Sequence, residues 1–239
     1  MKFDVLTLFP EMFEPIKHSI LERASKNNLI NINLVNIRDF SNDKHGHVDD
    51  TPYGGGAGMV MKPDVVYEAY KSIKDKDARV IYLSPKGKVL NQEKAKQLAT
   101  EKHLILLCGH YEGIDQRVLD KIVDEEISIG DYVLTGGEIP AMVLIDTVSR
   151  YVSGVLADDS TKEESFSKEN EKLLEYPQYT KPLEFDGEQV PEILTSGNHE
   201  KIDEWRKKQS LITTYKKRAD LLNENQKVEA KKLIDFNKS

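Results

Sequence analysis

Three glycine-bearing segments of the chain could bring backbone amide and carbonyl groups into direct contact with a small ligand. Each segment directly follows a short apolar run, and these runs begin roughly 24 residues apart. Glycine has no Cβ, so a ligand can approach its backbone closely. One such loop usually does no more than end a strand, but three at one edge of a sheet favour a small-molecule site. The segments are 83–87, 108–113 and 129–137.

Other reactive side chains give weaker signals. Residues 45–50 contain two imidazoles and two carboxylates, which could ligate a metal ion. Because no further ligand cluster completes a tetrahedral set, contacts within the loop or with a substrate are favoured, and no metal site is predicted. The single cysteine, Cys108, ends an apolar run. That position indicates a small buried hydrophobic residue rather than a nucleophile.

The glycine run at 53–59 resembles a phosphate cradle but lacks the Gly-Lys-Ser/Thr ending of a P-loop. Nucleotide hydrolysis is therefore disfavoured. No Gly-x-Gly-x-x-Gly fingerprint with a following acidic ribose anchor is present either, which argues against dinucleotide binding. The run is interpreted as a surface loop that covers a site.

Alternating strands and helices are the elements that must position these segments. The spacing predicts a parallel sheet with right-handed crossovers, so that the three glycine segments emerge at its carboxyl edge. Proline 63 suits the first position of a helix, and Asn91 suits an N-cap. The expected strands are 2–9, 31–37, 80–83, 104–108 and 127–129, and the expected helices are 11–29, 63–73, 91–100 and 139–152.

Length and composition indicate a soluble globular protein. The chain has 239 residues, 38% of them hydrophobic and 31% charged, which suits one large domain or one domain with a smaller companion. No apolar run approaches the roughly 18 residues of a membrane span, and the first residues are too polar for a signal peptide. A single cysteine favours the reducing cytosol, so a cytoplasmic location without membrane association is expected.

Charge is unevenly distributed towards the C-terminus. The net charge is −7, yet residues 201–218 carry seven basic and two acidic side chains, with Trp205 and Tyr215 among them. This stretch suits an RNA backbone with stacking aromatics, although a solvated helix face explains it equally well. Residues 158–175 are acidic and poor in large apolar side chains, which predicts a mobile linker. Beyond 193 the pattern predicts two to four helices.

Several long motifs follow one another along nearly the whole chain. They are Phe-Pro-Glu-Met-Phe at 9–13, Val-Asp-Asp-Thr-Pro-Tyr-Gly-Gly-Gly at 48–56, Gly-His-Tyr-Glu-Gly-Ile-Asp at 109–115, Ser-Ile-Gly-Asp-Tyr-Val-Leu-Thr-Gly-Gly-Glu at 128–138, Leu-Ile-Asp-Thr-Val-Ser-Arg at 144–150, Ser-Gly-Asn-His at 196–199 and Trp-Arg at 205–206. In type and order these motifs closely resemble the bacterial tRNA (guanine-N1)-methyltransferase family, TrmD.

This resemblance implies a SPOUT-type α/β domain with a deep trefoil knot over 1–157. A flexible acidic linker over 158–175 would carry the general base, and a small all-helical domain over 176–239 would bind tRNA. It further implies a homodimer that binds S-adenosylmethionine in the knot and the anticodon stem-loop of tRNA. The implied reaction methylates N1 of guanine 37, immediately 3′ of the anticodon. The family's dependence on magnesium implies Mg²⁺ as a second cofactor, which nothing in the sequence locates.

The resemblance also assigns residues. Guanine N1 carries a proton, so a base must remove it and a cation must stabilise the charge at O6. The family's Asp-Ser-Phe motif corresponds to Glu164-Ser165-Phe166, which makes Glu164 the implied base, with Glu163 as the rival, and Arg150 the implied cation. Asp49 is implied as a substrate contact. The implied cofactor residues are Tyr82, Leu83, Pro85, Gly109, Tyr111, Glu112, Gly113, Ser128, Ile129, Gly130, Asp131, Tyr132, Val133, Leu134, Gly136, Gly137 and Pro140.

Two other interpretations fit the sequence. A SPOUT methyltransferase could act on another RNA position, although the basic C-terminal stretch and the Ser-Gly-Asn-His motif favour the anticodon stem. A binding module could retain the cofactor fold without catalysis, because a glutamate replaces the usual aspartate at 164 and is longer by one methylene.

Overall fold

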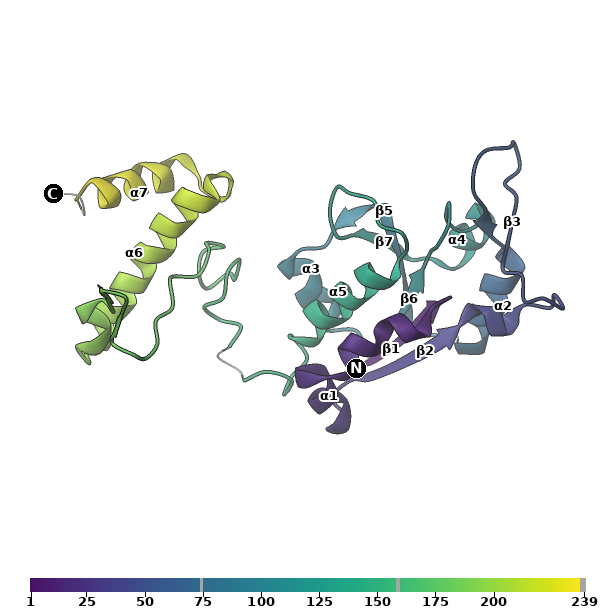
Figure 1. Ribbon diagram of the computed structural model, residues 1–239, viewed down its shortest axis with the longest axis horizontal. Coiled ribbons are helices and arrows are strands. Elements are labelled where there is room, and N and C mark those ends of the chain that lie inside the picture. Colours follow the sequence, from purple (N-terminus) through teal and green to yellow (C-terminus); the bar gives the residue numbers. More distant parts are fainter. Residues whose placement is uncertain (74, 158–159, 237–239) are drawn as a thin grey trace. The chain divides into compact units, whose positions relative to one another are not determined.

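The computed structural model describes residues 1–73, 75–157 and 160–236 (Figure 1). The chain separates into two compact units, Met1–Leu156 and Ala157–Ser239, called unit 1 and unit 2 below. Within the described residues, no helix combines the length and apolarity needed to cross a bilayer.

Unit 1 contains a five-stranded parallel sheet with the order β2-β1-β6-β5-β7. The prediction of parallel strands is confirmed, so the carboxyl ends of β5, β6 and β7 lie at one edge. The long-range neighbours β1 and β6 are joined through the register Phe3 to Leu104 and Val5 to Leu106. The strands are β1 Lys2–Thr7, β2 Asn31–Asn36, β5 Arg79–Val89, β6 His103–Cys108 and β7 Glu125–Ser128.

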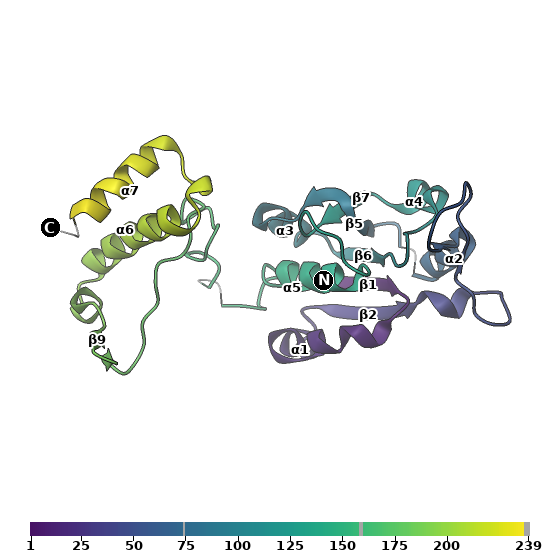
Figure 2. The same ribbon diagram turned by 45° about the horizontal axis from the view of Figure 1, so that its top comes forward.

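Helices cover both faces of this sheet, as Figures 1 and 2 show. Side chains of a strand alternate between faces. Leu104 and Leu106 pack with α1, α3 and α5, whereas Ile105 and Leu107 pack with α2 and α4. Every residue of β6 is therefore buried, as expected for the central strand of a three-layer α/β unit. The helices are α1 Ser19–Lys26, η2 Ile37–Phe40, α2 Pro63–Ile73, α3 Gln92–Leu98, α4 Gln116–Ile122 and α5 Glu138–Ser149.

The helix predicted over 11–29 is wrong, because the chain forms two shorter pieces there. A 3₁₀ helix, η1 Pro10–Lys17, contains Pro15, which cannot donate the backbone hydrogen bond of an α-helix. Ser19 then has a φ of 59°, which breaks the helical path before α1. The other two helix starts are confirmed: Pro63 begins α2, and the Asn91 side chain accepts a hydrogen bond from the Lys94 amide at the start of α3.

The first glycine segment lies inside β5 and not after it, which corrects the prediction of a strand ending at 83. The pairing with β7 shifts register between Leu83 and Lys88, so residues 84–87 form an irregularity within the strand. A Cβ on Gly87 would strike the backbone of Glu126, so only glycine lets β5 and β7 close again after this irregularity. The separate glycine run that begins at residue 53 lies between the short antiparallel strands β3 Asp49–Asp50 and β4 Val60–Met61, and its residues 53–58 are exposed.

Unit 2 is mainly helical, but it also contains a β-hairpin, whereas an all-helical domain was expected. The long helix α6 His199–Lys217 packs on α7 Glu224–Phe236, with the 3₁₀ helices η3 Glu192–Thr195 and η4 Ala219–Leu221 beside them. A hairpin precedes these helices, formed by β8 Glu184–Phe185 and β9 Glu188–Gln189. The Asn198 side chain caps α6 by accepting a hydrogen bond from the Lys201 amide.

The described part of the acidic segment is more structured than its composition predicts. Leu173 is buried in a small core with Leu211, Leu222 and Ala230. The Leu174 amide donates to Thr214 Oγ1 of α6 over 2.9 Å. A few hydrogen bonds and one leucine thus tie a polar segment to α6, while residues 158 and 159 lie outside the described part.

Candidate active site

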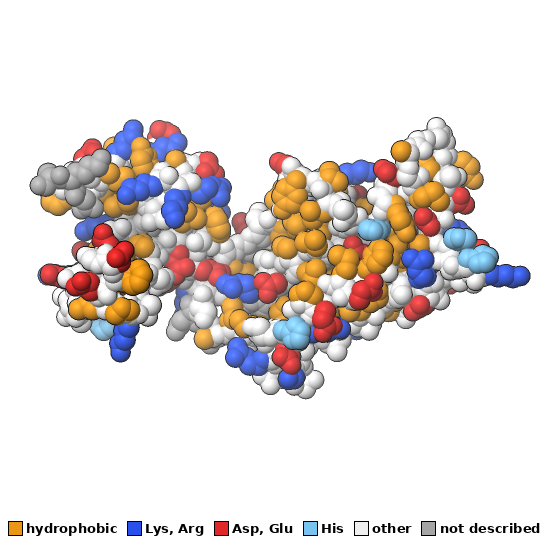
Figure 3. All heavy atoms as spheres, in the orientation of Figure 1, with side chains coloured by type: hydrophobic (Ala, Val, Ile, Leu, Met, Phe, Trp, Pro, Cys, Tyr) orange, Lys and Arg blue, Asp and Glu red, His pale blue; other side chains and the backbone are white. Residues whose placement is uncertain are grey.

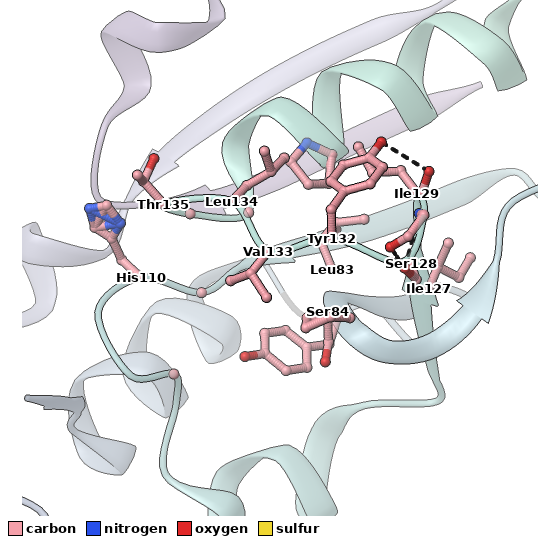
Figure 4. Close-up of a pocket in the computed structure, with 18 of the residues that line it drawn as sticks. Leu83, Ser84, His110, Ile127, Ser128, Ile129, Tyr132, Val133, Leu134 and Thr135 are labelled. Carbon is pink, nitrogen blue, oxygen red and sulfur yellow. Dashed lines mark hydrogen bonds between the residues drawn. The ribbon is translucent and has the colours of Figure 1, made fainter. Parts of the chain in front are cut away.

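The irregularity within β5, the carboxyl ends of β6 and β7, and the start of α5 enclose a cavity of about 230 Å³ (Figure 4). The three glycine segments singled out in the sequence therefore meet at one place. All of the predicted cofactor residues except Asp131 line the cavity. The lining also contains four residues absent from that prediction, which are Ser84, His110, Ile127 and Thr135.

Glycine backbones form one wall of the cavity. The Gly137 amide donates to the Gly109 carbonyl over 2.8 Å and so holds the start of α5 against the end of β6. A Cβ on Gly137 would lie 2.8 Å from the Cα of Cys108, and a Cβ on Gly109 would lie 2.8 Å from Tyr82 Oη. Only glycine therefore lets α5, β6 and Tyr82 pack this closely, and at these two positions the cavity is bordered by backbone.

The loop between β7 and α5 folds back on itself. Ser128 Oγ donates to the Gly130 carbonyl and accepts from the Gly130 amide, over 3.0 and 3.1 Å. The Tyr132 amide also donates to the Gly130 carbonyl, and Tyr132 Oη donates to the Ile129 carbonyl, a bond drawn dashed in Figure 4. This turn brings Tyr132 and Val133 to the cavity while Asp131 is exposed and does not line it.

Tyr82, which lines the cavity, is a largely buried and neutral side chain. Burial raises the pKa of Tyr82 to about 12, and the Glu126 carboxylate adds to this effect. Tyr82 therefore remains a neutral phenol that can donate a hydrogen bond. Burial also raises the pKa of the Cys108 thiol well above its usual value, which confirms this residue as an inert core side chain.

A buried carboxylate beneath the cavity was not found from the sequence. Glu138, the first residue of α5, is 1% exposed and accepts a hydrogen bond from Thr7 Oγ1 over 2.9 Å. Its Oε2 and His110 Nδ1 are both buried without a hydrogen-bond partner among the described residues. The only available signal was position: Glu138 follows two glycines at a helix start, where a carboxylate is stabilised by the helix dipole.

The predicted catalytic residues belong to different units. Arg150 is half-buried at the C-cap of α5 in unit 1, where its amide donates to the Asp146 carbonyl. Glu164 is half-buried in unit 2, and its carbonyl accepts from the Ser167 amide. Asp49 lies on β3 opposite Met61 and does not line the cavity.

Glu163, the rival base, already has partners in unit 2. Its Oε2 accepts a hydrogen bond from Tyr176 Oη over 2.9 Å and lies 3.8 Å from Arg206 Nη1. The Arg206 guanidinium in turn lies over the Tyr176 ring, 4.9 Å from its centroid.

Comparison with known proteins identifies the family of this chain. The family model described as tRNA (Guanine-1)-methyltransferase TrmD matches residues 1–224. The chain belongs to the TrmD family. This confirms the resemblance found in the motifs, and the family match covers unit 1 entirely and most of unit 2.

Curated relatives match nearly the whole chain with high identity. A protein of Ruminiclostridium cellulolyticum named tRNA (guanine-N(1)-)-methyltransferase is 59% identical over 229 residues, covering 93% of this chain and 97% of the relative. Proteins of the same name from Carboxydothermus hydrogenoformans and Clostridioides difficile are 59% and 54% identical, covering 93% and 92% of this chain and 87% and 97% of the relatives.

Proposed function

We propose that this protein is a tRNA (guanine-N1)-methyltransferase that uses S-adenosylmethionine and acts on guanine 37, immediately 3′ of the anticodon. The observation that carries the proposal is the coincidence of the family match with a cavity walled by glycine backbone. Such a wall suits a flat adenosine and its ribose, which bind through backbone amides and carbonyls. Bound S-adenosylmethionine supplies an electrophilic methyl group on sulfur.

The residues of this chain supply what guanine requires. Neutral N1 bears a proton and is a poor nucleophile. In the proposed reaction the Glu164 carboxylate accepts this proton as N1 bonds to the methyl carbon, and Arg150 stabilises the negative charge that develops at O6. The carbon–sulfur bond of the donor would break in the same step, and the sulfur would leave as a neutral thioether. Backbone of residues 109–113 and 129–137, with Tyr82 and Pro140, holds the methyl donor.

The substrate and the assembly are part of the proposal. The basic stretch 201–218, with Lys216 and Lys217 in the last turn of α6, suits the phosphates of an anticodon stem. Unit 1 is proposed to form the deep trefoil knot of the SPOUT class and to pair with a second copy in a cytoplasmic homodimer. Figure 3 shows hydrophobic side chains on the face of unit 1 that is turned to the viewer. The exposed hydrophobic residues of unit 1 include Met12 of η1 and Ile139 and Val143 of α5.

Magnesium is assigned no step. The described residues contain no group of three or more His, Cys, Asp or Glu side chains that could hold a metal ion. Mg²⁺ is proposed only as a second cofactor, and no residues are proposed as its ligands.

Methyl transfer from labelled S-adenosylmethionine to a tRNA transcript tests the function. We expect labelling that is lost when guanine 37 is replaced by adenosine, and a reverse-transcription stop at that position, because an N1-methyl group blocks base pairing. Glu164→Gln should lower kcat by about 10² to 10⁴-fold, the usual contribution of a general base, without changing cofactor affinity. Labelling of the adenosine transcript would refute the assigned position, and normal turnover by Glu164→Gln would refute the assigned base.

A further inference from the structure

The two neighbouring glutamates of the acidic segment differ in their surroundings. Glu163 is exposed, yet its carboxylate contacts Tyr176 and Arg206, which come from two later parts of unit 2. Arg206 also lies 3.5 Å from Asp203 Oδ1, one turn earlier on α6. The Glu163 carboxylate therefore joins the acidic segment to a small cluster on α6.

The cluster is more than one surface ion pair. A single exposed ion pair contributes only about 0–1 kcal/mol. Here the Arg206 guanidinium also lies over the Tyr176 ring, so that one arginine contacts two carboxylates and an aromatic face. Burial, with the hydrogen bond to Glu163 as a second cause, raises the pKa of Tyr176, so its hydroxyl stays protonated as a donor. Contacts that share partners in this way reinforce one another.

The residues that follow Glu164 are also held. Ser165 Oγ accepts a hydrogen bond from the Glu175 amide over 2.9 Å, and the Phe166 amide donates to the Leu173 carbonyl over 2.9 Å. The turn that carries Glu164 is thus fastened on one side by the Glu163 side chain and on the other by Ser165.

We infer that Glu163 is a positioning residue: by binding Tyr176 and Arg206 it fixes the turn from which the neighbouring Glu164 acts as the base. This inference rests on the proposed function. The inference assigns Glu163 a structural role and not that of the base, because its carboxylate already binds Tyr176 and Arg206. A general base must be held within hydrogen-bond reach of the proton it takes, and a displacement of about 1 Å can cost 10²-fold in rate.

Steady-state kinetics of matched variants test the inference. Glu163→Ala should lower kcat for tRNA methylation by roughly tenfold to a hundredfold with an unchanged KM for the cofactor, since only the placement of the base is lost. Glu163→Gln still accepts the Tyr176 hydrogen bond and should recover most of kcat with the wild-type pH profile.

Tyr176→Phe should reproduce part of the defect, and the double variant Glu163→Ala/Tyr176→Phe should be no worse than Glu163→Ala. Glu169→Ala removes the same charge from the same segment and should leave kcat unchanged.

Three kinetic outcomes would overturn the inference. They are full activity of Glu163→Ala, additive defects in the double variant, and a Glu163→Gln protein as inactive as Glu164→Gln, which would make Glu163 the base.

A readout without turnover separates this inference from the proposed function. Limited trypsin digestion at Lys172, which is followed by Leu173 and Leu174, reports how often the segment opens. Glu163→Ala should speed this cleavage several-fold, whereas Glu164→Ala and Glu169→Ala should not. Equal cleavage rates in all variants would refute the anchor even if the wild-type protein methylates tRNA. If only Glu163→Ala is cleaved faster and the wild-type protein is inactive, Glu163 still holds the turn through Tyr176 and Arg206, but the proposed function is refuted.

Discussion

The cavity of unit 1 is walled by backbone, whereas the candidate base of unit 2 stands on a turn that side chains hold in place. In unit 1 the Gly109 carbonyl and the Gly137 amide meet at a distance that leaves no room for a Cβ. In unit 2 the turn around Glu164 is fastened through Glu163, Ser165 and their partners. Substitutions that add atoms should therefore disrupt the backbone wall of unit 1, whereas substitutions that remove side-chain atoms should disrupt the turn of unit 2.

This difference suits two different tasks. A methyl donor is a small ligand, and a preorganised surface binds it with little cost for ordering the protein. A base that acts on a nucleobase must meet a large partner, and side-chain anchors can adjust to it. The variants below test whether the two regions respond in these opposite ways.

Gly137→Ala should have the largest effect. Its φ of −83° suits alanine, so the added Cβ acts only through its 2.8 Å approach to the Cα of Cys108. Overpacking against backbone should cost about 3 kcal/mol of stability and move the start of α5 away from the cavity. We expect S-adenosylmethionine to raise the Tm of the wild-type protein and not that of the variant.

Gly187→Ala is the matched control in unit 2. Gly187 has a φ of 82° with no atom within 4 Å of an added Cβ, so the change introduces backbone strain of about 1 kcal/mol and no clash. The cofactor-dependent rise in Tm should be retained. If Gly137→Ala also retains it, the start of α5 is not part of the cofactor wall.

Arg150→Ala should come next in size. Loss of a donor aimed at a developing oxyanion typically lowers kcat by about 10² to 10³-fold. The residue ends α5 and does not line the cavity, so the affinity for S-adenosylmethionine should remain unchanged. Single-turnover methylation of tRNA measures the first effect and calorimetric titration the second. Arg23→Ala, an exposed arginine of α1, serves as the control, and an equal defect in that variant would contradict the assigned role.

The elements around the cavity could be predicted because their signals are local. Apolar runs mark β5, β6 and β7, and the glycines mark where the backbone must be bare, so nearly the whole lining follows from three segments. Asp131 shows the limit of this reasoning. It belongs to the right loop, but hydrogen bonds of Ser128 and Tyr132 to Gly130 decide which side chains face the cavity.

Elements held by sparse or long-range contacts could not be predicted from composition. The segment before α6 looks like a linker because it has few large apolar residues, yet Leu173 and the Thr214 hydroxyl suffice to tie it to the helix. The regular apolar pattern over 11–29 predicts a single helix, whereas Pro15 and the left-handed backbone of Ser19 divide this stretch into η1 and α1. The β8–β9 hairpin had a readable signal in Asp186-Gly187, a pair typical of tight turns.

Lys216→Gln should have a smaller effect, confined to RNA binding. Lys216 is exposed in the last turn of α6, where a lysine can neutralise one phosphate. Removal of one phosphate contact should weaken tRNA binding a few-fold and reduce the slope of log Kd against log salt by about one. Filter binding at several salt concentrations gives the slope. Lys26→Gln, in unit 1, removes a lysine that pairs with Glu22 and should leave the slope unchanged. An unchanged slope in Lys216→Gln, or an equal reduction in both variants, would contradict a specific phosphate contact at Lys216.

Tyr82→Phe should have the smallest effect, which appears only in alkali. The pKa of Tyr82 is raised to about 12, while an unfolded tyrosine titrates near 10. Between these values the unfolded chain loses its proton first, so unfolding releases a proton and stability falls as pH rises. At pH 11 the wild-type protein should therefore have lost about 1 kcal/mol relative to its stability at pH 8, and Tyr82→Phe should not show this share of the loss. Tyr176→Phe should show the same sign, since the pKa of Tyr176 is also raised. Denaturant titrations at pH 8 and pH 11 measure both differences. If the free energy of unfolding falls equally with pH in the wild type and in Tyr82→Phe, the Tyr82 phenol beside Gly109 is open to solvent.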